Sequence, residues 1–203
     1  MVARREPEYM TVEEWRELER SSHDVKHEYI DGRVYAMTGG SRSLGRIGGN
    51  AVRTIEDALN AKGKQCYVYN SDVAVRVSSE KRLTYPDTTV SCDERDKPTR
   101  EETEIKFPCV IVEVLSDSTE AFDRGHKFAM YRACPTVQEY VLVATKYQAV
   151  EVYRRTSEGW TSIQFYEPGD EIELTSLDIH FPMDDIYRGA GIPEMVEEPE
   201  GEL

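Results

Sequence analysis

Residues 107–116, which read FPCVIVEVLS, decide the fold that this chain is expected to adopt. Apolar side chains surround one carboxylate, Glu113, and the run is too short and too rich in β-branched residues to be a membrane-spanning helix. The stretch therefore predicts a central strand that is covered on both faces of a sheet. A charged Glu113 is costly there unless a cation, a metal ion or strong hydrogen-bond donors meet it. The side chains that could satisfy Glu113 are thus the first candidates for a functional site.

The residues downstream of this strand alternate between helical and strand patterns. Hydroxyl and carboxylate side chains at 116–119 favour the start of a helix, which is expected near 119–133 because Pro135 follows it. Apolar runs separated by turn residues predict further strands at 139–143, 149–154, 159–166, 171–174 and 177–181. Because a helix lies between two strands of a buried type, the sheet is expected to be mixed.

The residues upstream carry two helix signals and a hairpin signal. Residues 11–14, TVEE, match a capping box, and residues 27–37 predict a hairpin whose turn is Asp31-Gly32. Apolar residues recur every three or four positions over 41–62, and Gly63 follows, so this segment is expected to be an amphipathic helix. Strands are expected at 66–69, 72–77 and 84–91. The predicted class is α/β or α+β, with a mixed sheet.

The composition indicates one globular domain with an acidic surface. The chain has 203 residues, of which 39 are acidic and 25 basic, and its formal charge is −14. Residues 1–189 are expected to form a single domain, and residues 190–203 an acidic, disordered tail. An acidic surface argues against avid, non-specific binding to phosphate backbones. It does not exclude a nucleic-acid enzyme whose metal ions supply the positive charge.

Cysteine usage and the shortness of the apolar runs predict a cytoplasmic protein. Cys66, Cys92, Cys109 and Cys134 show no C-x-x-C spacing, and two of them lie in apolar runs, so all four are expected to be reduced thiols. A disulfide or a zinc site is the alternative. Residues 1–8 are charged rather than signal-like, and no apolar run reaches membrane-spanning length, so no membrane association is expected.

Two carboxylates and a lysine form the candidate site. Asp87 follows Pro86 at the expected start of one strand, and Glu113 lies in the next buried strand, so neighbouring strands could bring the two acids together. Paired acids repel one another unless a cation binds between them, and hard oxygen ligands favour Mg²⁺ or Mn²⁺. From Glu113 the strand runs on for about 10 Å, and eight residues of a returning helix cover about 12 Å, which would bring Lys127 level with Glu113. An ammonium there could orient or help deprotonate a metal-bound water.

Each of these residues also has a purely structural interpretation. Lys127 could form a surface ion pair with Asp123, four residues earlier on the same helix. Asp87 could be a turn residue that follows Pro86. Glu113 could be satisfied by an arginine from elsewhere in the chain.

Five short motifs occur along the chain: EYIDG at 28–32, YPD at 85–87, VEVLSxST at 112–119, DRGxKxxxY at 123–131 and VEVY at 150–153. In this combination they resemble the Uma-two family of restriction-endonuclease-like proteins, which belongs to the PD-(D/E)XK nuclease superfamily. The resemblance covers roughly residues 10–187. It implies an α/β fold with a restriction-endonuclease-like mixed central sheet, flanked by helices and extended by additional antiparallel strands.

The resemblance also implies a set of site residues. Asp87 and Glu113 correspond to metal ligands, and the backbone carbonyl of Val114 would be a further ligand. In the superfamily a lysine normally stands two residues after the acid. Here that residue is Leu115, so the resemblance implies that Lys127, on the following helix, takes the role of the superfamily's lysine.

The function implied by the resemblance is hydrolysis of DNA with Mg²⁺ or Mn²⁺ by a homodimer. Glu28 is similar to the family's N-terminal acid and would hold a second metal ion or a water, although an acid beside a hairpin is usually solvated. The competing hypothesis is a non-catalytic scaffold or partner-binding module, whose buried acids are held by hydrogen bonds. The acidic surface favours this second hypothesis.

Overall fold

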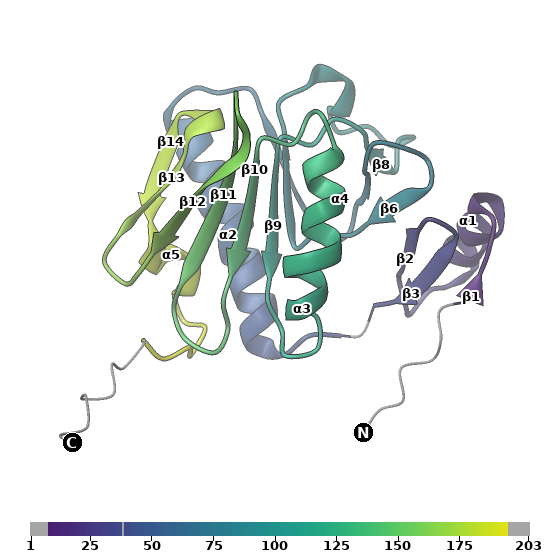
Figure 1. The fold of residues 1–203 in the computed structure, drawn as a ribbon, viewed down its shortest axis with the longest axis horizontal. Helices are drawn as coiled ribbons and strands as arrows, with labels where there is room; N and C mark the ends of the chain where they lie inside the picture. Colours follow the sequence, from purple (N-terminus) through teal and green to yellow (C-terminus); the bar gives the residue numbers. More distant parts are fainter. Residues whose placement is uncertain (1–7, 38, 195–203) are drawn as a thin grey trace.

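The computed structural model describes residues 8–37 and 39–194, and its centre is a mixed six-stranded sheet (Figure 1). Inside this sheet, β9 (Val110–Val114) runs parallel to β10 (Glu139–Val143) and antiparallel to β7 (Thr88–Ser91). The strand order is β12-β11-β10-β9-β7-β4, with β4 at Tyr67–Asn70, β11 at Val150–Thr156 and β12 at Gly159–Tyr166. The expected mixed sheet is confirmed.

Helices cover both faces of this sheet. α2 (Arg42–Ala61) lies on one face, in one hydrophobic core with Val110 and Val112 of β9. The other face is covered by a single helical segment made of α3 (Glu120–Phe122), the π-helical η2 (Asp123–Lys127) and α4 (Phe128–Ala133). Ile111 of β9 shares the core beneath this segment with Tyr131 of α4. Because successive residues of β9 point into opposite cores, the prediction of a strand covered on both faces is confirmed.

A second six-stranded sheet carries the N-terminal part of the chain. Its order is β1-β3-β2-β6-β5-β8, with β1 at Glu8–Tyr9, β2 at His27–Ile30, β3 at Arg33–Ala36, β5 at Ala74–Arg76, β6 at Arg82–Thr84 and β8 at Glu104–Ile105. α1 (Val12–Ser21) begins at the predicted capping box, in which Thr11 and Glu14 exchange hydrogen bonds. Asp31 and Gly32 have φ values of 50° and 90°, as a type I′ hairpin turn requires.

The C-terminal elements pack on the α2 side of the central sheet. β13 (Glu171–Leu174) and β14 (Ile179–Pro182) form a separate hairpin, and α5 (Met183–Tyr187) packs against α2. Two single 3₁₀ turns, η1 (Glu94–Asp96) and η3 (Thr175–Leu177), complete the described elements.

The segment 84–91 is not the single strand that the sequence suggested. Thr84 ends β6 in the second sheet and Thr88 begins β7 in the central sheet, so Tyr85, Pro86 and Asp87 link the two sheets. Pro86 cannot donate a hydrogen bond to a strand ladder, and its fixed φ restricts the chain at this point. The break leaves Asp87 at the junction of the sheets, just before β7.

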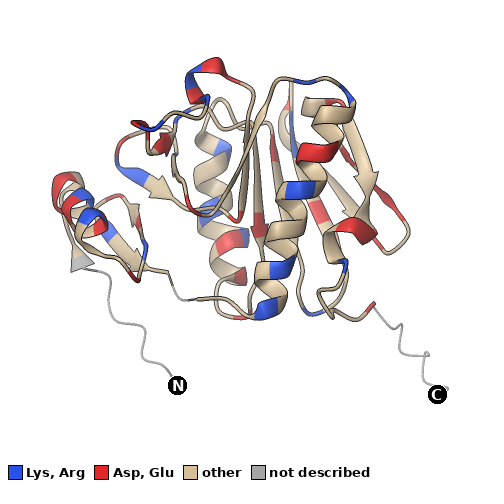
Figure 2. Cartoon of the chain, turned by 180° about the vertical axis from the view of Figure 1, so that it is seen from behind, with Lys and Arg blue, Asp and Glu red and all other residues tan. Residues whose placement is uncertain are grey.

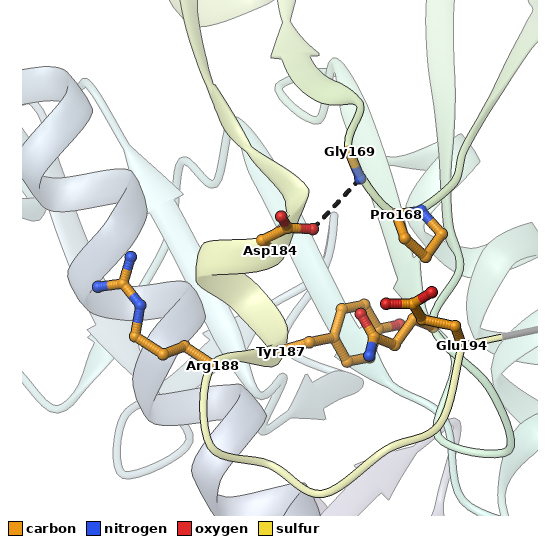
Figure 3. Close-up of a pocket in the computed structure, with 7 residues that line it drawn as sticks. Pro168, Gly169, Asp184, Tyr187, Arg188 and Glu194 are labelled. Carbon is orange, nitrogen blue, oxygen red and sulfur yellow. Dashed lines mark hydrogen bonds between the residues drawn. The ribbon is translucent and has the colours of Figure 1, made fainter.

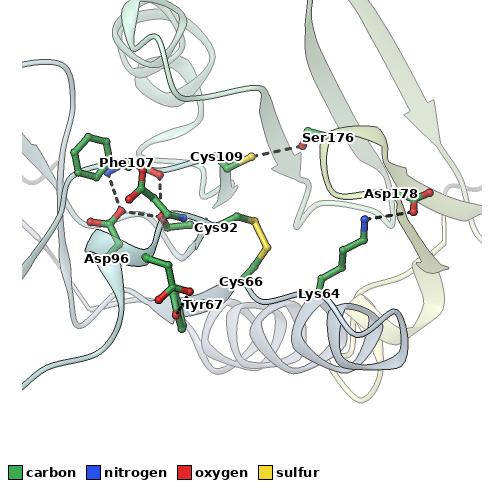
Figure 4. The surroundings of a disulfide bond; sticks show 12 residues. Lys64, Cys66, Tyr67, Cys92, Asp96, Phe107, Cys109, Ser176 and Asp178 are labelled. Carbon is green, nitrogen blue, oxygen red and sulfur yellow. Dashed lines mark hydrogen bonds and ion pairs between the residues drawn. A yellow bond between two sulfur atoms is a disulfide. The ribbon is translucent and has the colours of Figure 1, made fainter.

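Two of the four cysteines form a disulfide, which corrects the expectation that all four are reduced thiols (Figure 4). Cys66 and Cys92 directly flank the antiparallel pair of β4 and β7, with their Cα atoms 4.1 Å apart. Opposite positions on paired strands bring two thiols within bonding distance. The two cysteines are 26 residues apart in the sequence, and only the register of the strands brings them together. Cys109 and Cys134 are free thiols.

The chain stays packed beyond the expected boundary of the domain. Ala190 is buried, and the carbonyl of Pro193 accepts a hydrogen bond from the backbone N–H of Gln148. The rest of the expected acidic tail and the charged N-terminal stretch, residues 195–203 and 1–7, lie outside the described residues. Within the part of the chain that the structure describes, no helix is long and apolar enough to cross a membrane.

Candidate active site

The link between the two sheets places Asp87 beside Glu113. β7 and β9 pair with Thr88 opposite Val112, so the next position along the pair brings Asp87 opposite Glu113. The Asp87 carboxylate accepts a hydrogen bond from the backbone N–H of Val114, with 2.7 Å between the nitrogen and Oδ2. The two acids expected to converge therefore lie together where the paired strands end.

Lys127 reaches Glu113 from η2, which covers that face of the sheet. Its Nζ lies 2.9 Å from Oε1 of Glu28, 3.1 Å from Oε1 of Glu113 and 3.5 Å from Oδ1 of Asp123. Lys127 is 6% exposed and Asp123 is 2% exposed, so the two do not form the solvated surface pair of the structural interpretation. The ammonium instead lies at the centre of a buried group of carboxylates, and the partner of Glu113 is a lysine rather than an arginine.

Glu28 enters this group from the second sheet. It lies on β2, its side chain is buried, and its Oε1 also accepts a hydrogen bond of 3.2 Å from the backbone N–H of Tyr85. Glu28 thus connects the link between the sheets to Lys127, and it is not a solvated acid beside a hairpin. Together these residues form the acidic cluster, defined as Glu28, Asp87, Glu113, Asp123 and Lys127.

Asp123 and Tyr131 contact the site although the sequence analysis assigned neither of them a role in it. The Tyr131 hydroxyl donates to Oε1 of Glu113 at 3.1 Å, and its oxygen lies 3.0 Å from Oγ1 of Thr84. Asp123, Lys127 and Tyr131 follow one another at intervals of four, which places them on one side of a helical segment. This spacing was visible in the sequence, but only the fold shows that this side faces Glu113.

Burial raises the pKa values of three carboxyl groups in the acidic cluster, those of Asp87, Glu113 and Asp123. It raises the pKa of Asp87 to about 6, against the opposing effects of the Val114 N–H and of Lys127. Burial also raises the pKa of Glu113 well above its ordinary value and that of Asp123 above its own. Burial alone would lower the pKa of Lys127, but the attraction of three nearby carboxylates raises it well above its ordinary value. Four carboxyl groups face one ammonium, so a further cation would be electrostatically favoured.

The oxygen donors of the cluster fit a hard divalent cation such as Mg²⁺ or Mn²⁺. The hydrogen bonds to Glu113 from Lys127 and Tyr131 end on Oε1, and the bond from Val114 ends on Oδ2 of Asp87, which leaves the second oxygen of each acid as a potential ligand. Oδ1 of Asp123 is buried and, within residues 8–37 and 39–194, has no partner closer than its 3.5 Å ion pair with the lysine.

The described residues hold no group of three or more acid, histidine or cysteine side chains that would bind a metal ion by themselves. This is compatible with Mg²⁺, which one or two carboxylates usually bind together with water and substrate phosphates. Asp87 and Glu113 supply the two carboxylates. The carbonyl of Val114 as a third ligand stays a prediction.

A surface pocket of about 450 Å³ lies apart from the acidic cluster (Figure 3). It is lined by Gln148, Pro168, Gly169, Asp184, Tyr187, Arg188 and Glu194, none of which belongs to the cluster. Asp184 accepts a hydrogen bond from the backbone N–H of Gly169, and the Tyr187 hydroxyl donates to the carbonyl of Ala144. These polar groups hold loops of the C-terminal part together, so the candidate chemistry is assigned to the acidic cluster.

Comparisons with known proteins place the chain in a family. The chain matches the Uma2 family model, described as "Putative restriction endonuclease", over residues 12–184. One uncharacterized protein of Synechocystis sp. is 38% identical, covering 87% of this chain and 88% of its own length. A second from the same organism is 28% identical, covering 84% of this chain and 95% of its own length.

One solved structure shares the fold. The crystal structure of a "putative nuclease belonging to DUF820" from Anabaena variabilis matches with a TM-score of 0.69 and 18% identity, and covers 88% of this chain and 97% of that one. At this identity the match supports the mixed α/β architecture with its flanking helices. Because the family model matches residues 12–184, which is most of the chain, the chain belongs to the Uma2 family, described as "Putative restriction endonuclease".

Proposed function

We propose that this protein is a metal-dependent endonuclease that hydrolyses phosphodiester bonds in DNA. The observation that carries the proposal is the convergence of the partly buried Asp87 with the buried Glu113 and Lys127, with 3.1 Å between Nζ of Lys127 and Oε1 of Glu113. Membership of the Uma2 family agrees with it. Acid residues that converge in a buried site cost folding free energy, which is most easily explained if they bind a cation for chemistry.

Asp87 and Glu113 would hold Mg²⁺ or Mn²⁺. When bound, such an ion polarises a phosphoryl oxygen and lowers the pKa of the attacking water. The hydrogen bond from the Val114 N–H orients the Asp87 carboxylate, and the Tyr131 hydroxyl orients that of Glu113. Both acids therefore present a defined oxygen to the site before substrate binds.

Lys127 would act as a hydrogen-bond donor. Paired with carboxylates on three sides, it carries its positive charge into the site, where it can orient the attacking water or stabilise the charge that develops on the phosphate. Glu28 positions this ammonium through the 2.9 Å contact. A contact of Glu28 with a second metal ion or a water is a further part of the proposal.

Cleavage of a supercoiled plasmid tests the proposal. Wild-type protein with Mg²⁺ or Mn²⁺ is expected to nick or linearise the plasmid, whereas Asp87→Asn, Glu113→Gln and Lys127→Ala are each expected to lose activity by at least about a hundredfold. Asp117→Asn and Lys146→Ala are the matched controls, because these side chains are 86% and 61% exposed and lie outside the acidic cluster. Cleavage that persists in all three cluster variants would refute the site assignment.

The ion pairs of the cluster also support a second candidate, a scaffold that keeps the nuclease fold without catalysis. Lys127 already neutralises part of the charge of three acids, so the cluster could be purely structural. Calorimetric titration with Mg²⁺ and Mn²⁺ separates the two. Binding that is lost in Asp87→Asn supports the enzyme, and no heat at millimolar metal supports the scaffold.

A further inference from the structure

The exposed side of α2 is basic over its first three turns, in a chain whose formal charge is −14. Arg42, Arg46 and Arg53 are exposed, and their spacing of four and seven residues places them on one face of the helix. No acid occurs in α2 before Glu56. Figure 2 shows this helix in front of the central sheet, with basic positions along it before its acidic end. The opposite face of α2 is apolar and packs into the core.

The same helix lies against the acidic cluster at Gly48. A methyl group at this position would be 4.0 Å from Cβ of Asp87, so the α2 backbone lies beside the proposed metal ligand. Gly45 and Gly49 lie on the helix surface between Gly48 and the arginine face, and apart from their chain neighbours and the adjacent backbone of α2, no described atom comes within 4 Å of where their side chains would be. The surface of α2 between the arginines and Gly48 therefore carries two glycines rather than larger side chains.

We propose that the arginine face of α2, defined as Arg42, Arg46 and Arg53, binds the sugar-phosphate backbone of the DNA strand that is cut. The strand would pass over Gly45 and Gly49, where the bare helix surface allows close approach, and reach Asp87. This inference rests on the proposed function for its substrate. It adds a binding surface that lies outside the acidic cluster.

The dimensions and chemistry of this face suit a phosphodiester chain. Arg42 and Arg53 are eleven positions apart, which is about 16 Å along a helix and corresponds to about five phosphates of one strand when measured along the axis of a DNA duplex. Guanidinium groups bind phosphate oxygens through two parallel N–H donors. Arg46 is already oriented by a 3.2 Å hydrogen bond from its Nε to the carbonyl of Arg188. Glu56 and Asp57 end the basic face, and Asp57 lies 3.9 Å from Arg53.

DNA binding measured without cleavage tests the inference. Fluorescence anisotropy with a labelled DNA duplex, in the presence of a chelator, compares wild type with a triple variant in which Arg42, Arg46 and Arg53 are replaced by Gln. A second triple variant, with Lys81, Lys97 and Arg100 replaced by Gln, removes the same charge from exposed loops elsewhere. We expect the first variant to bind at least about tenfold more weakly, and the second to bind within about twofold of wild type.

The salt dependence provides a second readout. Each lost phosphate contact lowers the slope of log affinity against log salt by about 0.9, so the α2 variant should lose about 2.7 from the slope. This decrease in slope should be equal for two duplexes of unrelated sequence, because phosphate contacts carry no sequence information. Thermal unfolding of both variants checks that they remain folded.

Three results would overturn the inference: α2 and control variants that bind equally, a loss restricted to one DNA sequence, or a wild type that binds neither duplex. Failure of the proposed function looks different. If wild type binds DNA through α2 but cleaves none with any divalent metal, the binding surface is supported and the nuclease assignment is rejected. Conversely, if wild type cleaves the plasmid and the α2 variant binds DNA as well as wild type does, the nuclease assignment is kept and the binding surface on α2 is rejected.

Discussion

At the scale of single residues, Lys127 determines the electrostatic balance of the site. Three carboxylate oxygens lie within 3.5 Å of its Nζ, and its side chain is almost fully buried. Removing one member of a buried charge group leaves the others without compensation, which costs more than the pairing itself contributes. The stability of the metal-free protein should therefore depend on this one ammonium.

We predict that Lys127→Met lowers the free energy of unfolding by about 3–5 kcal/mol in the presence of a chelator, because the buried acids lose their cation. Millimolar Mg²⁺ should restore part of the loss if it binds the folded state at these acids. Urea denaturation with and without Mg²⁺ measures both effects. Lys146→Met is the control, since that side chain is 61% exposed and its surface pairs contribute at most about 1 kcal/mol. Equal stability of the two variants would contradict the prediction.

At the scale of elements, pairing with β4 holds β7, the strand that follows Asp87, in place. β7 leaves the link between the sheets at one end, and the disulfide of Cys66 and Cys92 joins it to β4 at the other (Figure 4). Strand register alone brings these two cysteines together, because they are 26 positions apart in the sequence. Whether Cys66 and Cys92 are oxidised to a disulfide can be tested directly.

We predict that two thiols, those of Cys109 and Cys134, react in the unfolded protein without reductant, and that four react after reduction. Closing a loop of this length should stabilise the oxidised protein by about 3.5 kcal/mol, because it restricts the unfolded chain. Thiol titration and urea denaturation before and after reduction measure the two quantities. The variant Cys66→Ser should match the reduced protein in stability. Four reactive thiols before reduction would disprove the disulfide.

At the scale of the whole molecule, an uncharged strand forms one edge of the central sheet. β12 is the outer strand, its sequence GWTSIQFY has no charged residue, and Ile163 and Phe165 are 46% and 63% exposed. Most natural edge strands carry charges or proline, which prevent pairing with another chain. In an acidic protein an uncharged edge is also where two copies repel one another least.

The homodimer expected from the family resemblance should therefore form through β12, which can pair with the same strand of a second copy about a two-fold axis. Sedimentation velocity of wild type should give a dimer, and Phe165→Lys should give a monomer because it places like charges at that interface. Tyr147→Lys, at a residue 38% exposed outside β12, should remain dimeric. A monomeric wild type, or a dimeric Phe165→Lys, would show that this edge is not the interface.

Local sequence signals predicted most of the elements. The capping box at Thr11, the type I′ turn at Asp31 and Gly32, and the short apolar run of β9 depend on neighbouring residues only, so the pattern suffices to identify them. Contacts between segments that are distant in the sequence could not be predicted from local signals. The break at Pro86 was missed because a proline at a strand start and a proline between two sheets look alike in sequence.

For the candidate site, the sequence by itself determined which residue types could act. The sequence showed an acid in an apolar strand, an acid after a proline and a lysine on the following helix. These features could be recognised because burial and charge are reflected in the local amino-acid composition. Only the tertiary structure decided that Asp123 and Tyr131 join them and that Glu28 comes from the other sheet. The physical reason is that a carboxylate's environment is set by the packing of distant segments, and this packing depends on strand register and helix orientation, which no local pattern encodes.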